Sequence, residues 1–266
     1  MNKQATIMKK VGIFDSGIGG LSVAKSVLKS KIFEKAIYYG DTARVPYGVK
    51  DSATIVRFAL ECLEFFAPHN IDMLIVACNT VSAYALEIMQ SKASFPIVGV
   101  IEAGVKARIN ALCDKDSTTL IIGTKATIES KQYEKRLSEL GYTRFVSKDT
   151  GLFVPLVEEG LYEGRGKAVL NSALKFYLEE FLDCAKLGHK KPQTIILGCT
   201  HFPLIAKEIG KFFGGNTVLI HSGEAIVELL ESSFNLAKNS FSHTHIDFYA
   251  SSDIEGLKNK AKIWLQ

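Results

Sequence analysis

The sequence alternates short apolar runs with longer segments of helical length along almost its whole extent. Runs such as 71–77 and 194–197 are short enough for buried strands. Because parallel strands need a crossover of a dozen or more residues, this rhythm predicts an α/β fold with parallel sheets covered by helices on both faces. We expect strands at 11–14, 36–39, 71–77, 96–100, 118–122, 143–149, 194–197, 218–220 and 246–251.

The chain is long enough for two domains. It has 266 residues, and each half carries its own run of strands. No Pro/Gly-rich linker separates the halves, so the boundaries follow from the strand pattern alone. We expect a discontinuous first α/β domain at 1–101 plus 223–266, with a second α/β domain, 102–222, inserted into it.

Composition excludes several classes of protein. The chain is 47% hydrophobic and 23% charged, which is typical of a globular protein. No apolar run approaches the roughly 18 residues of a membrane span, and Met1–Lys10 lacks the apolar core of a signal peptide. The net charge is only +4, and the basic run at Lys186–Lys191 suits a solvated helix end better than a nucleic-acid site. We therefore expect a cytoplasmic protein that binds neither membrane nor nucleic acid.

Two of the five cysteines have a distinctive setting. The number is odd and no C-x-x-C occurs, so a disulfide framework is not expected. Cys62, Cys113 and Cys184 suit the role of small buried hydrophobes or inert thiols. Cys78 in "LIVACNT" and Cys199 in "IILGCTH" instead end apolar runs and are followed by polar residues.

Both of these cysteines stand where a parallel sheet binds ligands. Ligands of open α/β sheets lie at the carboxyl ends of strands, and each cysteine is expected to end a strand and open a helix. A helix N-terminus favours a thiolate, lowers the thiol pKa, and can hold a carboxylate on its free N–H groups. We therefore expect each half to bring an activated thiol and an anion-binding turn to a shared cleft; the alternative is a pair of buried strand-end cysteines.

A third loop, "FDSGIGG" at Phe14–Gly20, follows the first expected strand. It lacks the pattern of a dinucleotide-binding loop and the lysine of a P-loop. Asp15 would repel a phosphate, whereas it suits a bound ammonium group or a thiol that must give up its proton. The alternative is that Asp15 and Ser16 only cap the following helix.

A pair of thiols from two halves suits one kind of reaction. Inverting a carbon α to a carboxylate requires a base on one face and an acid on the other, and the two exchange roles in the reverse direction. With each sulfur about 3–3.5 Å from the carbon, the sulfurs would lie roughly 6–8 Å apart.

Eight segments, taken in order, resemble glutamate racemases of the aspartate/glutamate racemase superfamily. They are "FDSGIGGLSV", "YYGDTARVPYG", "IVACNTVSA", "PIVGVIEA", "IIGTKATIES", "FVPLVEEG", "ILGCTHFPLI" and "IHSGEAIVE". The resemblance implies two doubly wound domains related by a pseudo-twofold axis, with the active site in the cleft between them. It also implies cofactor-independent, two-base interconversion of L- and D-glutamate, which supplies D-glutamate for peptidoglycan.

Site residues carry over where the motifs match. The resemblance implies that Cys78 deprotonates D-glutamate and Cys199 deprotonates L-glutamate. Asp15, His201 and Glu158 are the implied acid–base helpers, although the neighbouring Glu159 blurs the last assignment. The implied substrate contacts are Asp15, Ser16, Tyr47, Gly48, Asn79, Thr80, Thr124, Thr127, Thr200 and His201. Helix capping by His201, and plain turn positions for Tyr47 and Gly48, are the structural alternatives. Ala103 stands where the family often has proline.

Cofactors are not expected. Cys199 and His201 form a C-x-H pair, which with one distant cysteine falls short of the usual four-ligand zinc set, and no lysine motif indicates pyridoxal phosphate. As partners we expect glutamate and a second copy of the chain, since racemases of this kind often form homodimers. Two other functions stay open: a racemase for aspartate or another acidic amino acid, and a non-catalytic protein that binds acidic amino acids.

Overall fold

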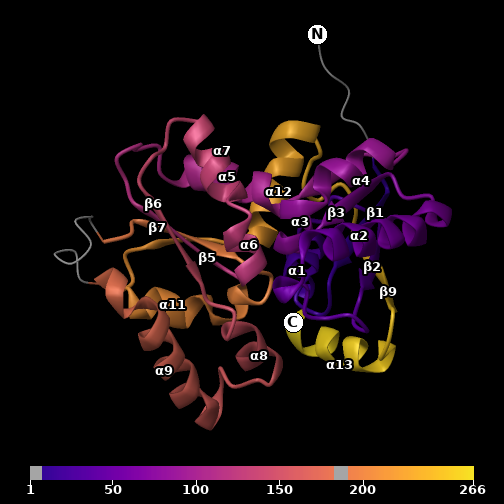
Figure 1. The fold of residues 1–266 in the computed structure, drawn as a ribbon. Coiled ribbons are helices and arrows are strands. Elements are labelled where there is room, and N and C mark those ends of the chain that lie inside the picture. The colour runs from indigo at the N-terminus through magenta and orange to yellow at the C-terminus, as the bar shows by residue number, and fades with distance from the viewer. Residues whose placement is uncertain (1–7, 183–190) are drawn as a thin grey trace.

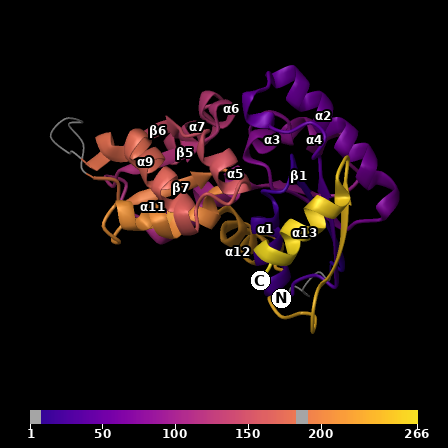
Figure 2. The same cartoon turned by 90° about the horizontal axis from the view of Figure 1, so that it is seen from below.

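The computed structural model describes residues 8–182 and 191–266, and in it the chain forms two parallel β-sheets, each with helices on both faces (Figures 1 and 2). The expected α/β class with two doubly wound domains is thereby confirmed. Cys184 and most of the basic run at 186–191 lie outside the described residues.

The first sheet has five strands in the order β4-β3-β1-β2-β9. Their bounds are β1 Lys10–Asp15, β2 Lys35–Gly40, β3 Met73–Val76, β4 Ile97–Gly99 and β9 His245–Ala250. The central strands β1 and β3 are almost wholly buried, because helices cover both faces. The covering helices are α1 Leu21–Ser30, α2 Ser52–Phe66, α3 Asn79–Tyr84, α4 Leu86–Lys92 and α13 Ile254–Trp264.

The second sheet has four strands in the order β6-β5-β7-β8. Their bounds are β5 Thr119–Gly123, β6 Phe145–Asp149, β7 Thr194–Gly198 and β8 Val218–Ile220. The helices of this half are α6 Lys125–Glu129, α7 Gln132–Glu139, α8 Phe153–Glu158, α9 Lys167–Leu178 and α11 Ala206–Phe212. Each of the nine strands that the described residues form overlaps a predicted one, with bounds that differ by a few residues.

Two helices connect the sheets. The chain leaves the first sheet through α5 (Val100–Ala111) and returns through α12 (Ser222–Phe234), and these helices pack against each other. Both lie in the middle of the molecule in Figure 1. The predicted domain boundaries, at 101/102 and 222/223, fall within these helices and stay predictions.

The order of strands places a crevice at the same point of each sheet. In the first sheet the connections run outward in opposite directions from β1 and β3, and in the second from β5 and β7. Such switch points leave room for a ligand beyond the carboxyl ends of the strands. Gly123 pairs with Gly198, so Thr124 and Cys199 leave the second sheet side by side. Phe14 pairs with Val76, which places the loop after β1 beside the segment that contains Cys78.

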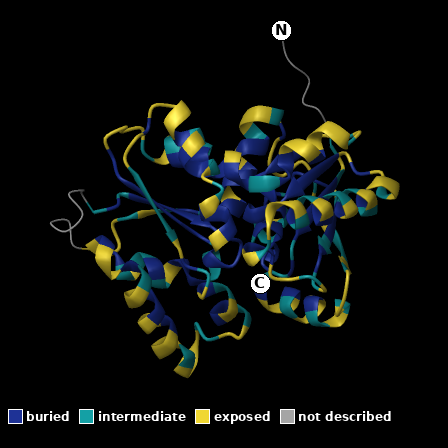
Figure 3. Ribbon diagram, in the orientation of Figure 1, coloured by how far each residue is buried: buried dark blue, intermediate teal, exposed yellow. Residues whose placement is uncertain are grey.

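The pattern of burial agrees with two sheets that are each covered by helices. The strand interiors are dark blue in Figure 3, whereas the outer helix faces are exposed. Arg108 of α5 is fully buried and donates to the hydroxyls of Thr119 and Ser117, which fixes α5 to the start of the second sheet. Within the described residues, no helix combines the length and apolar character needed to cross a membrane.

Candidate active site

Both cysteines line one cavity between the two sheets. Its volume is about 500 Å³, and its walls include Cys78 from the first sheet and Cys199 from the second. Of the predicted site residues, the following also line it: Ser16, Tyr47, Gly48, Asn79, Thr80, Thr124, Thr127, Glu158, Thr200 and His201. Segments more than 100 residues apart in the sequence thus meet at one site.

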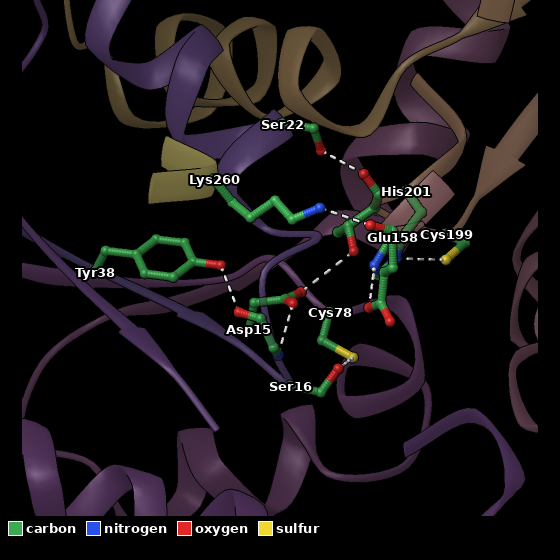
Figure 4. A network of polar contacts seen from close by, with 11 residues as sticks. Asp15, Ser16, Ser22, Tyr38, Cys78, Glu158, Cys199, His201 and Lys260 are labelled. Carbon is green, nitrogen blue, oxygen red and sulfur yellow. Dashed lines mark hydrogen bonds and ion pairs between the residues drawn. The ribbon is translucent and has the colours of Figure 1, made fainter. Parts of the chain in front are cut away.

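Cys78 is the N-cap residue of α3, as expected, and is 6% exposed. Its Sγ donates a hydrogen bond to Ser16 Oγ over 3.4 Å (Figure 4). Burial, together with the negative charge of Asp15, raises the pKa of the thiol to about 12, and the contact with Ser16 only partly opposes this. The prediction of a lowered pKa at Cys78 is therefore wrong: desolvation outweighs the favourable end of a six-residue helix.

Cys199 lies in a different setting. The segment after β7 forms a turn, then a 3₁₀ helix, Phe202–Ile205, and then α11. The predicted helix is therefore present, but Cys199 does not open it, because it begins only after His201. Pro203 sits in the first turn of the 3₁₀ helix, where its missing N–H is tolerated. The turn brings His201 Nδ1 to 3.6 Å from Cys199 Sγ.

His201 links Cys199 to Glu158. Its Nε2 lies 2.9 Å from Glu158 Oε1, and the ring is almost completely buried. Burial lowers the pKa of His201, but the contacts with Cys199 and Glu158 outweigh it and raise the pKa to about 10. The imidazole is therefore protonated at neutral pH and lies between a sulfur and a carboxylate.

Asp15 is fully buried and does not form part of the cavity wall. Burial raises its pKa, although His201 and two backbone N–H groups act in the opposite direction. Its Oδ2 accepts from Gly17 N over 2.9 Å, while Thr200 Oγ1 donates to Oδ1 over 3.4 Å. Asp15 therefore acts on the site through its charge and through the loop it holds, and its predicted contact with substrate stays a prediction.

Three threonine hydroxyls gather on one wall. Thr80 Oγ1 lies 3.2 Å from the hydroxyls of both Thr124 and Thr127, and those two are 3.1 Å apart. Next to them, Asn79 Oδ1 accepts from Tyr133 over 2.7 Å. The amide nitrogen of Asn79 is buried and has no hydrogen-bond partner among the described residues. This wall therefore offers several donors to an anionic group.

The loop 41–49 forms another wall. Tyr47 is buried and its hydroxyl donates to Asp41, while Arg44 Nε lies 2.6 Å from the same carboxylate. The hydroxyl of Tyr47 is thus committed within the protein, and burial and this bond raise its pKa. Tyr47 therefore lines the cavity with its ring and backbone, and its hydroxyl is not free to act as a proton donor there.

Two glycines let the halves approach closely. A Cβ on Gly19 would lie 2.3 Å from Thr200 Oγ1 and 2.6 Å from the ring of His201. A Cβ on Gly48 would lie 2.5 Å from Thr124 Cβ. A larger residue at either position would push the two walls of the cavity apart.

The cavity has further lining residues that the sequence did not indicate. They are Gly17, Val45, Pro46, Val49, Lys125, Asp149, Gly151, Val154, Pro155 and Gly198. Lys125 stood within the quoted "GTKAT", so its position between two predicted contact residues was a usable signal. Pro155 likewise stood within the quoted "FVPLVEEG", close to the predicted Glu158. Asp149 had no such signal, because nothing local indicates that the end of β6 reaches the same cavity.

The described residues hold no group of three or more His, Cys, Asp or Glu side chains arranged for a metal ion. The polar groups of the cavity can instead bind an amino acid with two carboxylates. The hydrogen-bond donors of the cavity lie on the threonine wall, formed by Thr80, Thr124 and Thr127, and the two thiols of the cavity come from opposite halves of the molecule. This arrangement can move a proton at a carbon held between them.

Comparisons with known proteins agree with this geometry. Residues 22–230 match the family model described as Asp/Glu/Hydantoin racemase. A glutamate racemase from Campylobacter jejuni is 54% identical over 96% of this chain and 98% of its own length. The crystal structure of glutamate racemase from that species superposes with a TM-score of 0.89, covering 96% of this chain and 98% of the other. Glutamate racemase from Francisella tularensis in complex with D-glutamate is 33% identical, covers 98% of this chain and 95% of its own, and has a TM-score of 0.82.

Proposed function

Since this chain belongs to the Asp/Glu/hydantoin racemase family, we propose that it interconverts L- and D-glutamate by moving the α-proton between Cys78 and Cys199. The expected enzyme class, a racemase acting on amino acids, is confirmed by these relatives. The observation that carries the proposal is the pair of thiols that line one cavity from two different sheets.

The reaction starts with one thiolate and one thiol. In the direction from L-glutamate, the thiolate of Cys199 removes the α-proton and becomes a thiol, leaving an electron pair on the substrate carbon. Cys78 then donates its own proton to the opposite face, which gives D-glutamate and the thiolate of Cys78. The reverse reaction uses the same groups with the roles exchanged.

The resting state of the site suits the first of these directions. The raised pKa of Cys78 keeps it protonated and ready to donate. The protonated ring of His201 lies beside Cys199, with Nδ1 3.6 Å from the sulfur that removes the α-proton in this direction. In the other direction, the ammonium group of the bound substrate favours ionisation of Cys78 through its positive charge.

Glutamate fits the donors of the cavity. We assign its side-chain carboxylate to the threonine wall, where Thr80, Thr124, Thr127 and the unpartnered amide of Asn79 can donate. The substrate of the Francisella tularensis relative, D-glutamate, supports this choice over aspartate. The depth of the pocket decides between the two substrates, because a shorter side chain would leave buried donors without partners.

Exchange in D₂O tests the proposal. We expect the purified protein to remove the α-proton signal of L-glutamate while optical rotation falls to zero, with aspartate handled at least about tenfold more slowly. Equal turnover of both substrates would favour a broader acidic amino-acid racemase. Binding of glutamate without any exchange would indicate a binding protein and reject the proposal.

The reaction needs no cofactor, because the two thiols carry both proton transfers. Protein treated with a chelator and free of absorbance in the aldimine region should keep its full activity. Activity that depends on added zinc or pyridoxal phosphate would contradict this.

The cellular role of the enzyme follows from its product, D-glutamate. We propose that it works in the cytoplasm, as a homodimer, and supplies D-glutamate for peptidoglycan. The gene should restore growth of a bacterium that requires D-glutamate, and the purified protein should have the mass of a dimer in light scattering. A monomer mass at all concentrations would reject the dimer, and failure to restore growth by an active enzyme would reject the role.

A further inference from the structure

The last described helix, α13, contacts His201 and Glu158, which together with Cys199 we call the histidine relay. Helix α13 belongs to the first sheet, whereas His201 and Glu158 belong to the second half. Lys260 of α13 extends its ammonium group to the carbonyl oxygen of Glu158 over 2.6 Å (Figure 4). Neither local sequence nor the cavity itself indicates this contact, which joins residues 102 positions apart.

The acceptor is well placed for a lysine. Glu158 is the last residue of α8, and the last carbonyls of a helix have no partner within it and carry a partial negative charge. A lysine that donates there satisfies one of these groups. Lys260 is partly buried, so its ammonium group is less screened than one on an open surface.

A second residue of α13 contacts the same relay. Trp264, one helical turn after Lys260, packs edge-on against His201 with the ring centroids 6.1 Å apart. Residues four apart share one face of a helix. Helix α13 therefore presents one face to both Glu158 and His201.

The contacts form one chain of groups that ends at a thiol. Lys260 holds the backbone of Glu158, the carboxylate of Glu158 lies 2.9 Å from His201 Nε2, and His201 Nδ1 lies 3.6 Å from Cys199 Sγ. The Glu158 side chain is 35% exposed, so without an anchor it has room to turn towards water. We propose that Lys260 is a positioning residue for the reaction proposed above: it fixes Glu158 so that His201 stays against Cys199.

Kinetics of matched variants test the positioning. Lys260→Met should lower kcat/KM about tenfold, mainly through kcat, because small displacements of reacting groups cost much of the rate. Lys260→Arg should restore most of it, since a guanidinium also donates to a carbonyl. Lys258→Met is the control. Lys258 is on the same helix and is exposed, and among the described residues its ion pair is with Glu255, at 3.0 Å, so its variant should stay within about twofold.

A double-mutant cycle separates positioning from simple stability. If Lys260 acts through Glu158, then Lys260→Met in a Glu158→Gln background should cost little more than Glu158→Gln alone. Full additivity of the two losses would overturn the proposal, and so would a Lys260→Met variant with unchanged kinetics.

An NMR measurement on the substrate-free protein tests whether the contact between Lys260 and Glu158 affects His201, independently of catalysis. The imidazole ¹⁵N signals of His201, identified by their loss in His201→Asn, should move in Lys260→Met in the same direction as in Glu158→Gln, and stay in place in Lys258→Met. Unmoved signals in Lys260→Met would overturn the positioning even in an active enzyme. A wild-type chain that does not racemise glutamate would reject the proposed function, while these spectra would still decide the role of Lys260.

Discussion

The two thiols lie in the same cavity but have different neighbours. Cys78 has a hydroxyl beside it, from Ser16, and the carboxylate of Asp15 nearby. Cys199 has an imidazole beside it, and a carboxylate beyond the imidazole. Nearby negative charge disfavours a thiolate at Cys78, whereas the group beside Cys199 is a ring with a raised pKa.

The difference shows that two chemically identical side chains can meet in one cavity and still have unlike electrostatic surroundings. A two-base racemase needs one protonated and one ionised thiol at the start of each turnover. The neighbours of Cys78 hold its proton in place, and those of Cys199 supply a positive charge. The two thiols thus lie in different electrostatic surroundings before substrate arrives.

The most severe test of the difference between Cys78 and Cys199 is to remove each thiol in turn. Cys78→Ala and Cys199→Ala should each lower racemisation by roughly 10²–10⁴-fold, because inversion requires acid and base together. Residual α-proton exchange in D₂O should favour D-glutamate in Cys199→Ala and L-glutamate in Cys78→Ala.

Cys62→Ala serves as the control for these variants, because Cys62 is buried in α2 away from the cavity. Its racemisation rate should be close to that of the wild type. Equal residual exchange of both enantiomers in the two active-site variants would contradict the two-base arrangement.

Removing the imidazole should weaken the Cys199 side alone. His201→Asn loses a charged hydrogen-bonding partner of Cys199, and we expect kcat/KM to fall about 10–100-fold. Alkylation by iodoacetamide, followed residue by residue with mass spectrometry, should slow at Cys199 and not at Cys78. Slower reaction at both thiols would mean that the two sides are not independent.

The protonation of His201 should also appear in the stability of the fold. Its pKa is about 10 in the folded protein, above the ordinary value near 6.5 in the unfolded chain. The stabilisation is therefore complete below pH 6.5 and is lost as pH rises through 10. Between pH 7 and 9 the free energy of unfolding should fall by about 2.5 kcal/mol more in the wild type than in His201→Asn. Parallel curves from urea unfolding for the two proteins would show that His201 is not protonated in the fold.

The smallest effect is expected at Ser16. Its hydroxyl makes one hydrogen bond with Cys78, over 3.4 Å, so Ser16→Ala should lower kcat/KM about 3–10-fold. Ser22→Ala is a suitable comparison, since Ser22 donates to the backbone of Thr200 over 2.6 Å and so bears on the Cys199 side. A loss at Ser16 as large as that at His201 would remove the distinction between the two sides.

Much of this site follows from the sequence because of one rule of topology. In a parallel sheet the carboxyl ends of neighbouring strands share an edge, so an apolar run ending in Cys78 or Cys199 already indicates where the thiol lies. The hydroxyls of Thr80, Thr124 and Thr127 followed from the motifs of the family, and the cavity brings them together.

The remainder depends on contacts that no local pattern encodes. The raised pKa of Cys78 results from burial by both halves, which strand spacing does not reveal. The 3₁₀ turn after Cys199 depends on how "CTHFP" packs, and Lys260 reaches Glu158 only because α13, from the first half, lies against the end of α8 in the second. Tyr47 was predicted as a substrate contact, but the hydrogen bond from its hydroxyl to Asp41 depends on the folded shape of the loop 41–49, which the sequence does not reveal.

The pairing of β9 with β2 has a consequence for how the chain is made. Strand β9 lies at residues 245–250, beyond the whole second half, and it covers the edge of β2 at residues 35–40. During synthesis, residues 119–220 leave the ribosome before β9 does, so we expect the second half to fold while the first is still missing an edge strand. Until then β2 presents unpaired backbone groups, which invite pairing with other chains. A nascent chain that has emerged from the ribosome only as far as a point between residues 220 and 245 would therefore have a complete second half beside an open, aggregation-prone sheet.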